Sequence, residues 1–426
     1  MEKDIYKTSR TLYIIEAALE YLIAISVGTL YLTKLAMHVG LSDSATGILL
    51  SFVALGTSFQ CFAVLLAGQS SVKKWVFLGH VVSQLLFCSI YFIGVAPLSN
   101  ASKAVGIVVF LLLAQAIHNF INSPKITWYM SLVPYEQKGR FTANKEIISL
   151  ICGMLFSYGL AYFLERCEAQ GDLPTAFVWI GVIILVLTVL HSATLAFSKE
   201  KIVEKPKIKI KETLKGLCKE KGLYKVIIVA CGWSVASYVS TPFMGTYQLN
   251  ELAFLPTTVS IISVVSSIMR ILFSKTMGKL ADRYSFTKML KVCFTIEAVA
   301  FLINSFAVPA NGKIVYTVFA ILHAVGLAGI NSATINLIYD YVSVENCMSA
   351  LAIKSTVSGL VGFLSTLLMG PLVAYIQNNG NRFLGLPLYA QQVLSFFSFI
   401  VLALLLVYIR FGMEKPIHAD EHTVSE

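Results

Sequence analysis

Charged residues are scarce in this sequence. Only 13% of its 426 residues are Asp, Glu, Lys or Arg, whereas 57% are hydrophobic, and the mean hydropathy is +0.75. Soluble globular proteins carry about 25% charged residues, so this composition excludes that class. The few charges also gather in short stretches that separate long apolar runs. The chain is therefore expected to lie in a membrane.

Several patterns that indicate other chemistries are absent. No P-loop of the form GxxxxGK[ST] occurs, which argues against direct drive by ATP, and no paired catalytic motif suggests an enzyme. The eight cysteines show no CxxC or Cys/His spacing, so neither a metal site nor a cofactor is expected. The first ten residues are charged and merge into an apolar run, so we expect no cleavable signal peptide.

Long apolar runs are what the sequence has in abundance. A helix needs about 20 mainly apolar residues to cross the hydrocarbon core of a bilayer. Runs of this length predict helices rather than a barrel, because helices satisfy their own backbone hydrogen bonds. We predict an all-α membrane protein with twelve transmembrane spans, near 11–37, 43–67, 75–96, 104–131, 142–164, 174–197, 223–249, 257–277, 288–308, 313–339, 349–376 and 387–411.

The basic residues predict an orientation. If the N-terminus is cytoplasmic and the spans alternate, 25 of the 33 Lys and Arg residues fall inside and five outside, and Lys125, Arg270 and Lys354 fall within spans. This positive-inside pattern predicts a multi-pass protein of the cell (plasma) membrane with both termini in the cytoplasm. The net charge of +10 is then explained by topology and contact with anionic membrane lipid, and no nucleic-acid partner is expected.

A lysine-rich segment lies between the sixth and seventh spans. It is interpreted as a solvated cytoplasmic linker, with a regulatory or lipid-binding switch as the alternative. The predicted domains are an N-terminal six-helix bundle at 1–197, the basic linker at 198–222, a C-terminal six-helix bundle at 223–411 and a cytoplasmic tail at 412–426.

An internal repeat supports the division into two halves. At an offset of 209 residues, ten of the 33 positions from Ile121 to Gly153 are identical to the second half, where about two are expected by chance. The match includes Asn122 with Asn331 and Lys145 with Lys354. Such a duplication predicts two pseudo-symmetric six-helix bundles.

Two loop motifs indicate a family. Between the eighth and ninth spans the chain reads Gly278-Lys-Leu-Ala-Asp-Arg-Tyr-Ser-Phe-Thr-Lys288. This stretch resembles the G-x-L-A-D-R-x-G-x-x-K/R motif of the major facilitator superfamily of transporters, with Ser285 where glycine is usual. The loop between the fourth and fifth spans, from Val133 to Phe141, is similar to that superfamily's P-x-x-x-R-G-R segment. In the first half's version of the first motif, Val72 replaces the aspartate.

The resemblance implies a mechanism and a cytoplasmic gate. It implies that the two bundles rock about a central cavity lined by the first, fourth, seventh and tenth spans. The glycine of the motif is expected to allow a tight turn, and its aspartate to lie near a helix N-terminus, where the macrodipole favours an anion. The predicted gate residues are Gly278, Asp282, Arg283, Lys145 and Lys354, and for the last two snorkelling to lipid phosphate is the alternative.

Two acidic residues in the first span are the predicted coupling residues. Charges inside a span cost about 2.5–3.5 kcal/mol each on insertion scales, so they usually face a protein interior. Glu16 and Glu20 lie four residues apart and therefore on one helix face. We expect Glu20 first and Glu16 second to carry coupling or substrate charge, with Arg270 as partner; the alternative is a structural salt bridge.

Polar side chains at helical spacing mark the expected substrate site. They fall on the spans that the resemblance assigns to the cavity, and hydrogen-bonded packing is the alternative, above all for the histidine. The candidates are Gln115, Asn119, Asn122, Tyr129, Trp233, His323 and Asn331. His118 is expected to be a hydrogen-bonded packing residue, with contact to substrate as the alternative, and Lys125 stays open between snorkelling to lipid phosphate and a gate role. Glu297, on a peripheral span, is expected to form a structural pair.

These observations predict a secondary transporter of a small organic solute. Alternating access by a rocker-switch motion is expected, as ion-coupled symport with H+ or Na+ or as uniport. Drug or metabolite efflux by proton antiport is an alternative, and so is a non-transporting receptor or scaffold on a transporter fold. The superfamily's antiporter Gly-Pro is absent, since the fifth span reads Gly153-Met-Leu-Phe-Ser-Tyr-Gly159. We expect the protein to be a monomer.

Overall fold

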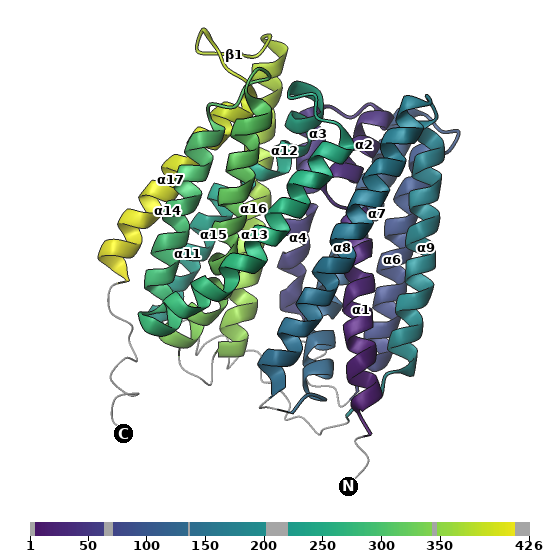
Figure 1. Ribbon diagram of the computed structural model, residues 1–426, viewed down its shortest axis with the longest axis vertical. Coiled ribbons are helices and arrows are strands. Elements are labelled where there is room, and N and C mark those ends of the chain that lie inside the picture. Colours follow the sequence, from purple (N-terminus) through teal and green to yellow (C-terminus); the bar gives the residue numbers. More distant parts are fainter. Residues whose placement is uncertain (1–4, 64–70, 135–136, 202–219, 343–346, 414–426) are drawn as a thin grey trace. The chain divides into compact units, whose positions relative to one another are not determined.

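The computed structural model describes residues 5–63, 71–134, 137–201, 220–342 and 347–413, which are almost entirely helical (Figure 1). All twelve predicted spans are helical, which confirms the predicted fold class. Several predicted features lie partly outside the described residues. They are the end of the second span at 64–67, the start of the first half's version of the loop motif (Gly68–Lys74), residues 135–136 of the loop between the fourth and fifth spans, most of the linker at 198–222 and nearly all of the tail at 412–426.

Among the described residues, the first six spans contain nine helical segments, several of them short. The first span is α1 (Lys7–Ser26) with α2 (Thr29–Val39), and the second is α3 (Asp43–Leu50), α4 (Phe52–Ser58) and the 3-10 helix η1 (Phe59–Ala63). The next four are single helices: α6 (Lys73–Val95), α7 (Asn100–Met130), α8 (Lys138–Ala169) and α9 (Leu173–Phe197).

The last six spans follow the same plan. The seventh consists of α11 (Lys221–Tyr238), the 3-10 helix η3 (Thr241–Phe243), α12 (Met244–Thr246) and the π-helix η4 (Tyr247–Glu251). The others are single helices: α13 (Pro256–Arg283), α14 (Phe286–Asn304), α15 (Gly312–Tyr341), α16 (Cys347–Asn378) and α17 (Ala390–Gly412). A two-stranded hairpin, β1 (Arg382–Phe383) with β2 (Leu386–Pro387), joins α16 to α17.

Two spans are interrupted for identifiable reasons. Between α1 and α2 the backbone of Gly28 is extended, and a Cβ there would lie 2.9 Å from the carbonyl oxygen of Ile25. Between α11 and α12 lies Pro242, which has no N–H to donate and so opens a short 3-10 turn. A short π-helix follows, a rare conformation that occurs frequently at functional sites. Both interruptions fall on spans that the resemblance assigns to the cavity.

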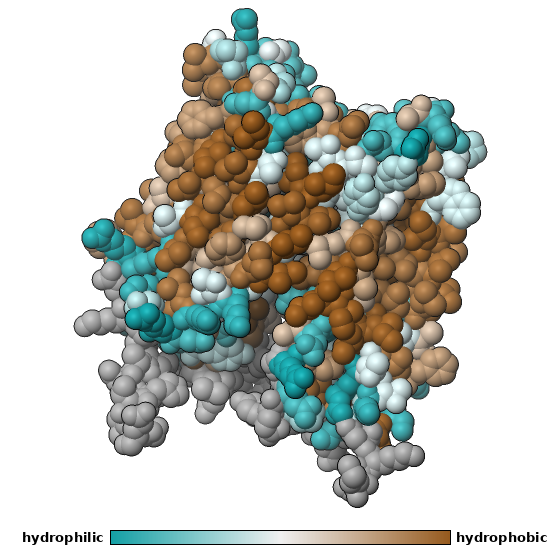
Figure 2. Space-filling view, viewed as in Figure 1, coloured by the Kyte–Doolittle hydropathy of each residue, from teal (hydrophilic) through white to brown (hydrophobic). Residues whose placement is uncertain are grey.

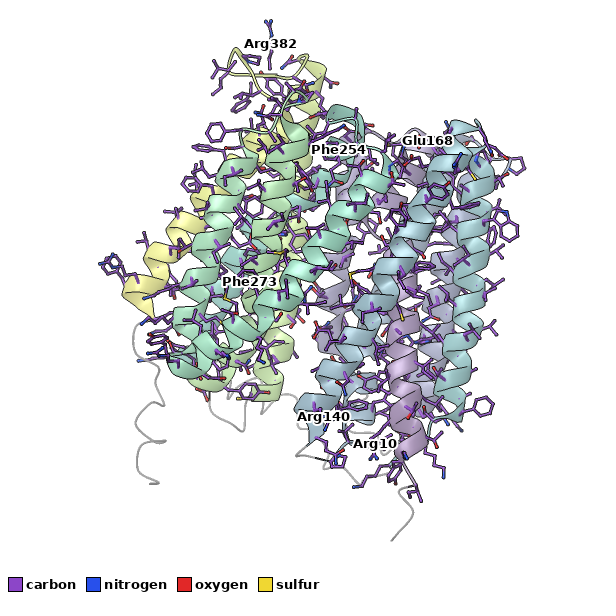
Figure 3. The ribbon with its side chains drawn as sticks, in the orientation of Figure 1. Arg10, Arg140, Glu168, Phe254, Phe273 and Arg382 are labelled. Atoms are coloured by element: carbon purple, nitrogen blue, oxygen red, sulfur yellow. The ribbon has the colours of Figure 1, made fainter. Side chains whose placement is uncertain are left out.

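Eleven helical stretches among the described residues are long and apolar enough to cross a membrane. The remaining predicted span, α14, is 19 residues long and carries Lys288, Lys291 and Glu297. Figure 2 shows apolar side chains over the middle of the helices and hydrophilic side chains towards their ends. In Figure 3, Arg10 and Arg140 lie at one end of the first helices and Glu168 at the other. This distribution agrees with a multi-pass membrane protein.

The chain divides into two compact units. Unit 1 comprises Met1–Ser42, Leu55–Ile208 and Leu255–Ser260, and unit 2 comprises Asp43–Ala54, Lys209–Phe254 and Ile261–Glu426. In unit 1, α6 packs against α7 and α9, and α1 packs against α8 and α9. In unit 2, α14 packs against α15 and α17, and α11 packs against α16 and α17.

Each unit includes the beginning of one span from the other predicted half. In unit 1, Thr257 at the start of α13 donates both its backbone N–H (3.2 Å) and its hydroxyl (2.6 Å) to Glu165 on α8. In unit 2, Asp43 at the start of α3 accepts hydrogen bonds from Asn250 (2.9 Å) and Gln377 (2.8 Å). The two segments that fall in the opposite unit, Asp43–Ala54 and Leu255–Ser260, occupy corresponding positions at the 209-residue offset of the internal repeat. The same part of each half is therefore the part that joins the other unit.

Candidate functional site

Four helices of unit 1 bring ionisable side chains to one place. Helix α1 carries Glu16 and Glu20, which lie on one face because they are four residues apart. Helix α7 contributes Lys125 together with His118, and the two remaining members are His80 on α6 and His191 on α9. We call these six residues the charged cluster. It joins segments that lie up to 175 residues apart in the sequence.

Lys125 stands at the centre of the charged cluster. Its ammonium nitrogen lies 2.9 Å from Oε1 of Glu16 and donates a hydrogen bond to Oε2 of Glu20. The Lys125 side chain is 2% exposed and that of Glu16 is fully buried. Buried ions are tolerated when they are paired and hydrogen-bonded, and losing one partner then costs far more than the pair itself contributes. The sequence left Lys125 open between snorkelling to lipid and a gate role, whereas the structure makes it the partner of both glutamates.

His191 links Glu16 to a neutral partner. Its Nε2 lies 2.9 Å from Glu16 Oε1, and its Nδ1 lies 3.1 Å from the side-chain nitrogen of Gln84. As the Gln84 amide is oriented, its nitrogen donates to Nδ1, so the ring proton sits on Nε2 and is donated to Glu16. A neutral His191 therefore satisfies both contacts.

Two histidines face Glu20 without a hydrogen bond to it. Glu20 Oε1 lies 3.9 Å from Nδ1 of His80 and 3.8 Å from Nε2 of His118, both beyond normal hydrogen-bonding distance. His80 is fully buried, and among the described residues neither of its ring nitrogens has a hydrogen-bond partner. The same holds for Glu20 Oε1 and Glu16 Oε2. With neutral histidines, two carboxylates and one ammonium leave this buried site with a net charge of about −1.

An aromatic stack lies about one helical turn from the charged cluster, since Tyr13 precedes Glu16 on α1 and Tyr129 follows Lys125 on α7. The rings of Tyr13 and Tyr129 are parallel, with centroids 4.1 Å apart, and Lys145 places its ammonium 5.0 Å from the Tyr13 ring. The Tyr129 hydroxyl donates a hydrogen bond of 3.0 Å to Ser198. Tyr129 is thus buried in packing contacts, and its role in substrate binding stays a prediction. Lys145 contacts an aromatic face of the first span, which is a cation–π arrangement.

The amide side chains of α7 differ in their surroundings. Gln115 and Asn119 are buried, and Asn119 donates to the Gln115 carbonyl (2.9 Å) and accepts from Gln60 (3.3 Å). Asn122 is only half-buried, and its repeat partner Asn331 on α15 is exposed. The two repeat-related asparagines therefore have more freedom to meet a ligand than the buried pair, and the substrate role of all four stays a prediction.

Unit 2 contains an acid–histidine pair whose acid is buried. Glu297 on α14 is fully buried, and its Oε2 lies 2.8 Å from Nδ1 of His323 on α15. The His323 ring also stacks on Phe319, with centroids 5.4 Å apart. The structural pairing expected for Glu297 is therefore present, with a partner that the sequence did not identify. His323, expected at the substrate site, has one ring nitrogen occupied by this pair.

Three further predicted residues lie in unit 2. Trp233 on α11 is partly exposed and stacks on Phe294 of α14, with centroids 5.7 Å apart. Arg270 on α13 is partly exposed, and Lys354 on α16 is buried. Arg270 was the expected partner of Glu20, but the described partner of that carboxylate is Lys125. A charge role for Arg270 itself stays a prediction.

Gly326 makes room for the Glu297 carboxylate. A Cβ at position 326 would lie 2.5 Å from Glu297 Oε1. We expect Gly326→Ala to lower the free energy of unfolding by about 1–3 kcal/mol, the usual cost of overpacking, and thermal unfolding in detergent would measure it. Gly159→Ala on α8 is the matched control, since a Cβ there meets nothing within 4 Å. Equal midpoints for the two variants would contradict the close packing.

The motif between the eighth and ninth spans departs from its expected geometry. Gly278 lies inside α13, which continues to Arg283, so the tight turn expected at this glycine is wrong. The residues that follow it are mostly good helix formers, which extends the helix. The chain turns later, and Ser285 caps α14 by accepting a 3.1 Å hydrogen bond from the Lys288 backbone. Asp282 and Arg283 are exposed on the last turn of α13, and their gate role stays a prediction.

Comparison with known proteins supports the family resemblance. The sequence profile described as Major Facilitator Superfamily matches residues 226–424. No curated protein sequence matches the chain. The profile match lies in the half that carries the Gly278 motif, and it confirms the resemblance predicted from that motif.

Solved structures share the fold over nearly the whole chain. A mutant of the nucleoside transporter NupG has a TM-score of 0.73 at 14% identity, and the match covers 94% of this chain and 99% of that one. A bacterial homologue of the human lysosomal transporter Spinster has a TM-score of 0.66 at 12% identity (96% and 97%). A D-xylose–proton symporter has 0.64 at 12% (94% and 96%). These relatives are transporters and not enzymes.

Proposed function

Since this chain is a multi-pass membrane protein with the major facilitator fold, we propose that it is a secondary transporter of a small organic solute. In this proposal the N-terminal bundle (1–197) and the C-terminal bundle (223–411) rock about a central site, joined by a cytoplasmic linker. Differential affinity of the two states for substrate and coupling ion shifts the equilibrium between them. The protein acts as a monomer in the cell membrane, in contact with lipid and with both termini in the cytoplasm.

The observation that carries this proposal is the charged cluster. A buried site with two carboxylates, one ammonium and unpaired acceptor atoms is costly to fold, so such residues inside membrane proteins usually serve transport. The side chains next to Glu20 are imidazoles and an ammonium. Hard metal ions such as Na+ prefer carbonyl and carboxylate oxygens instead. This chemistry favours H+ over Na+ as the coupling ion. Glu20 is the better proton carrier of the two glutamates, because its side chain is 20% exposed whereas that of Glu16 is fully buried.

The substrate class follows from hydrogen-bonding capacity. The candidate residues on the expected cavity spans are amides, an indole and an imidazole, which suit solutes rich in hydroxyl groups. Two of the structural relatives are named for a nucleoside and for D-xylose. Nucleosides and monosaccharides are therefore the first compounds to test, and a bound solute should raise the unfolding midpoint by mass action.

A counterflow assay in proteoliposomes tests the transport proposal. Liposomes preloaded with a solute that raises the midpoint should accumulate the labelled solute transiently, without any ion gradient, because a carrier exchanges its substrate across the membrane. A solute that binds to the purified protein but shows no counterflow would contradict the transporter proposal and favour a receptor or scaffold.

A further inference from the structure

Three of the chain's seven histidines meet inside unit 1. His80 comes from α6, His118 from α7 and His191 from α9. The His80 ring lies 5.0 Å from that of His191 and 5.7 Å from that of His118, between ring centroids. Because the three residues are on different helices, their convergence is a property of the fold and not of any local spacing.

The ligand atoms of this group are close enough to share an ion. One ligand atom from each of Glu20, His80 and His191 lies within 4.8 Å of the other two. His118 adds a nitrogen 3.8 Å from Glu20 Oε1. Around a tetrahedral zinc ion with bonds of about 2.0–2.2 Å, ligand atoms lie roughly 3.3 Å apart. The observed separations therefore require side-chain shifts of about an ångström, without a change in the helices.

The unpaired atoms of the cluster point to a cation. Both nitrogens of the buried His80 and Oε1 of Glu20 have no hydrogen-bond partner among the described residues. Leaving a buried polar atom unsatisfied costs its full desolvation penalty, and a native structure usually has a reason for it. A coordinated cation would use these lone pairs and offset the net negative charge of the site. Imidazole with carboxylate is a ligand set that suits zinc, nickel and related divalent ions.

We propose that Glu20, His80 and His191 bind one divalent transition-metal ion of the zinc and cobalt class, with His118 as a fourth ligand. For His191 to coordinate through Nε2, that nitrogen must leave Glu16 and the ring proton must move to Nδ1. The Gln84 amide can accommodate this change, because its oxygen is unpaired and a flip would let it accept from Nδ1–H. Such an acceptor behind a ligating histidine is the usual second-shell arrangement.

Lys125 remains compatible with the ion. It bonds Oε2 of Glu20 and Oε1 of Glu16, which leaves Oε1 of Glu20 for coordination. A bound ion would hold Glu20 deprotonated and in place, so occupancy is expected to inhibit any process that needs this carboxylate to titrate. The binding proposal itself stands apart from the proposed transport function.

Metal binding by the purified full-length chain tests the proposal. His418 and His422 in the C-terminal tail offer a competing site, so the experiments use the H418Q/H422Q background. Calorimetric titration with ZnCl2 should give one ion per chain, and CoCl2 should produce the visible absorption of tetrahedral Co2+. We expect His80→Gln and His191→Gln each to weaken Zn2+ binding by about 100-fold or more, since even second-shell losses cost 10- to 100-fold.

Two controls separate coordination from folding. His323→Gln removes a partly buried histidine of unit 2 and should leave Zn2+ affinity unchanged. His80→Phe fills the same buried space without ring nitrogens, so its metal-free unfolding midpoint should equal or exceed that of the parent while Zn2+ binding is lost. No stoichiometric binding in the parent, or binding that persists in both His80→Phe and His191→Gln, would show adventitious ions only and would overturn the proposal.

Discussion

Glu20→Gln is expected to reduce pH-driven solute uptake to the level of protein-free liposomes while counterflow of the same solute survives. The substitution keeps the shape of the side chain and removes its titration, so the proton can no longer follow the solute through the cycle. Lys125 retains Glu16 as a charged partner in this variant, so the bundle should remain folded. Uptake driven by an imposed pH gradient and counterflow without one are measured on the same proteoliposome preparation.

Glu297→Gln is the matched control for this prediction. Glu297 too is a carboxylate beside a histidine, but it is fully buried, lies in unit 2 and is paired at 2.8 Å. We expect this variant to lose some thermal stability and to keep pH-driven uptake. If Glu20→Gln transports with an unchanged response to pH, the coupling assignment is wrong. If Glu297→Gln instead is the variant that loses the response, coupling resides in the second unit.

The helices were predictable because their signal is local. A run of about 20 apolar residues is sufficient to predict a span, whatever the rest of the chain does. Even α14 was predicted, although its three charged residues place it outside the eleven most apolar stretches. The turn after the eighth span was predicted two helical turns too early, because a glycine in a loop motif was given more weight than the helix formers that follow it.

The composition of the charged cluster was only partly predictable. Glu16 and Glu20 were identified because two acids four residues apart in an apolar span have no common local explanation. Arg270 was expected to be their partner. The sequence shows that a basic residue lies within a span but not which helix it faces, so Lys125 could not be recognised as the partner. His80 and His191 were missed, because each is an isolated histidine in its own span and no spacing links them. Packing of α6 and α9 against their neighbours supplies that link.

Lys125→Met is expected to have the largest effect on stability. Removing the ammonium leaves Glu16 and Glu20 as two buried carboxylates with no cationic side chain between them, and breaking a buried ion pair typically costs about 3–5 kcal/mol. We expect a loss of that size in the free energy of unfolding, together with loss of uptake. Thermal unfolding of the purified variant measures the first and proteoliposome uptake measures the second. Lys74→Met, which removes an exposed lysine of α6, should change neither.

A second substitution distinguishes charge from packing at the same position. Lys125→Met combined with Glu16→Gln restores the net charge of the cluster to that of the parent, because one positive and one negative group are removed together. If charge balance causes the instability, the double variant should recover a large part of the lost stability while uptake remains absent, since Glu20 still lacks its partner. If the double variant is as unstable as the single one, Lys125 acts through its packing and hydrogen bonds. In that case the ammonium does not stabilise the protein by neutralising a buried negative charge.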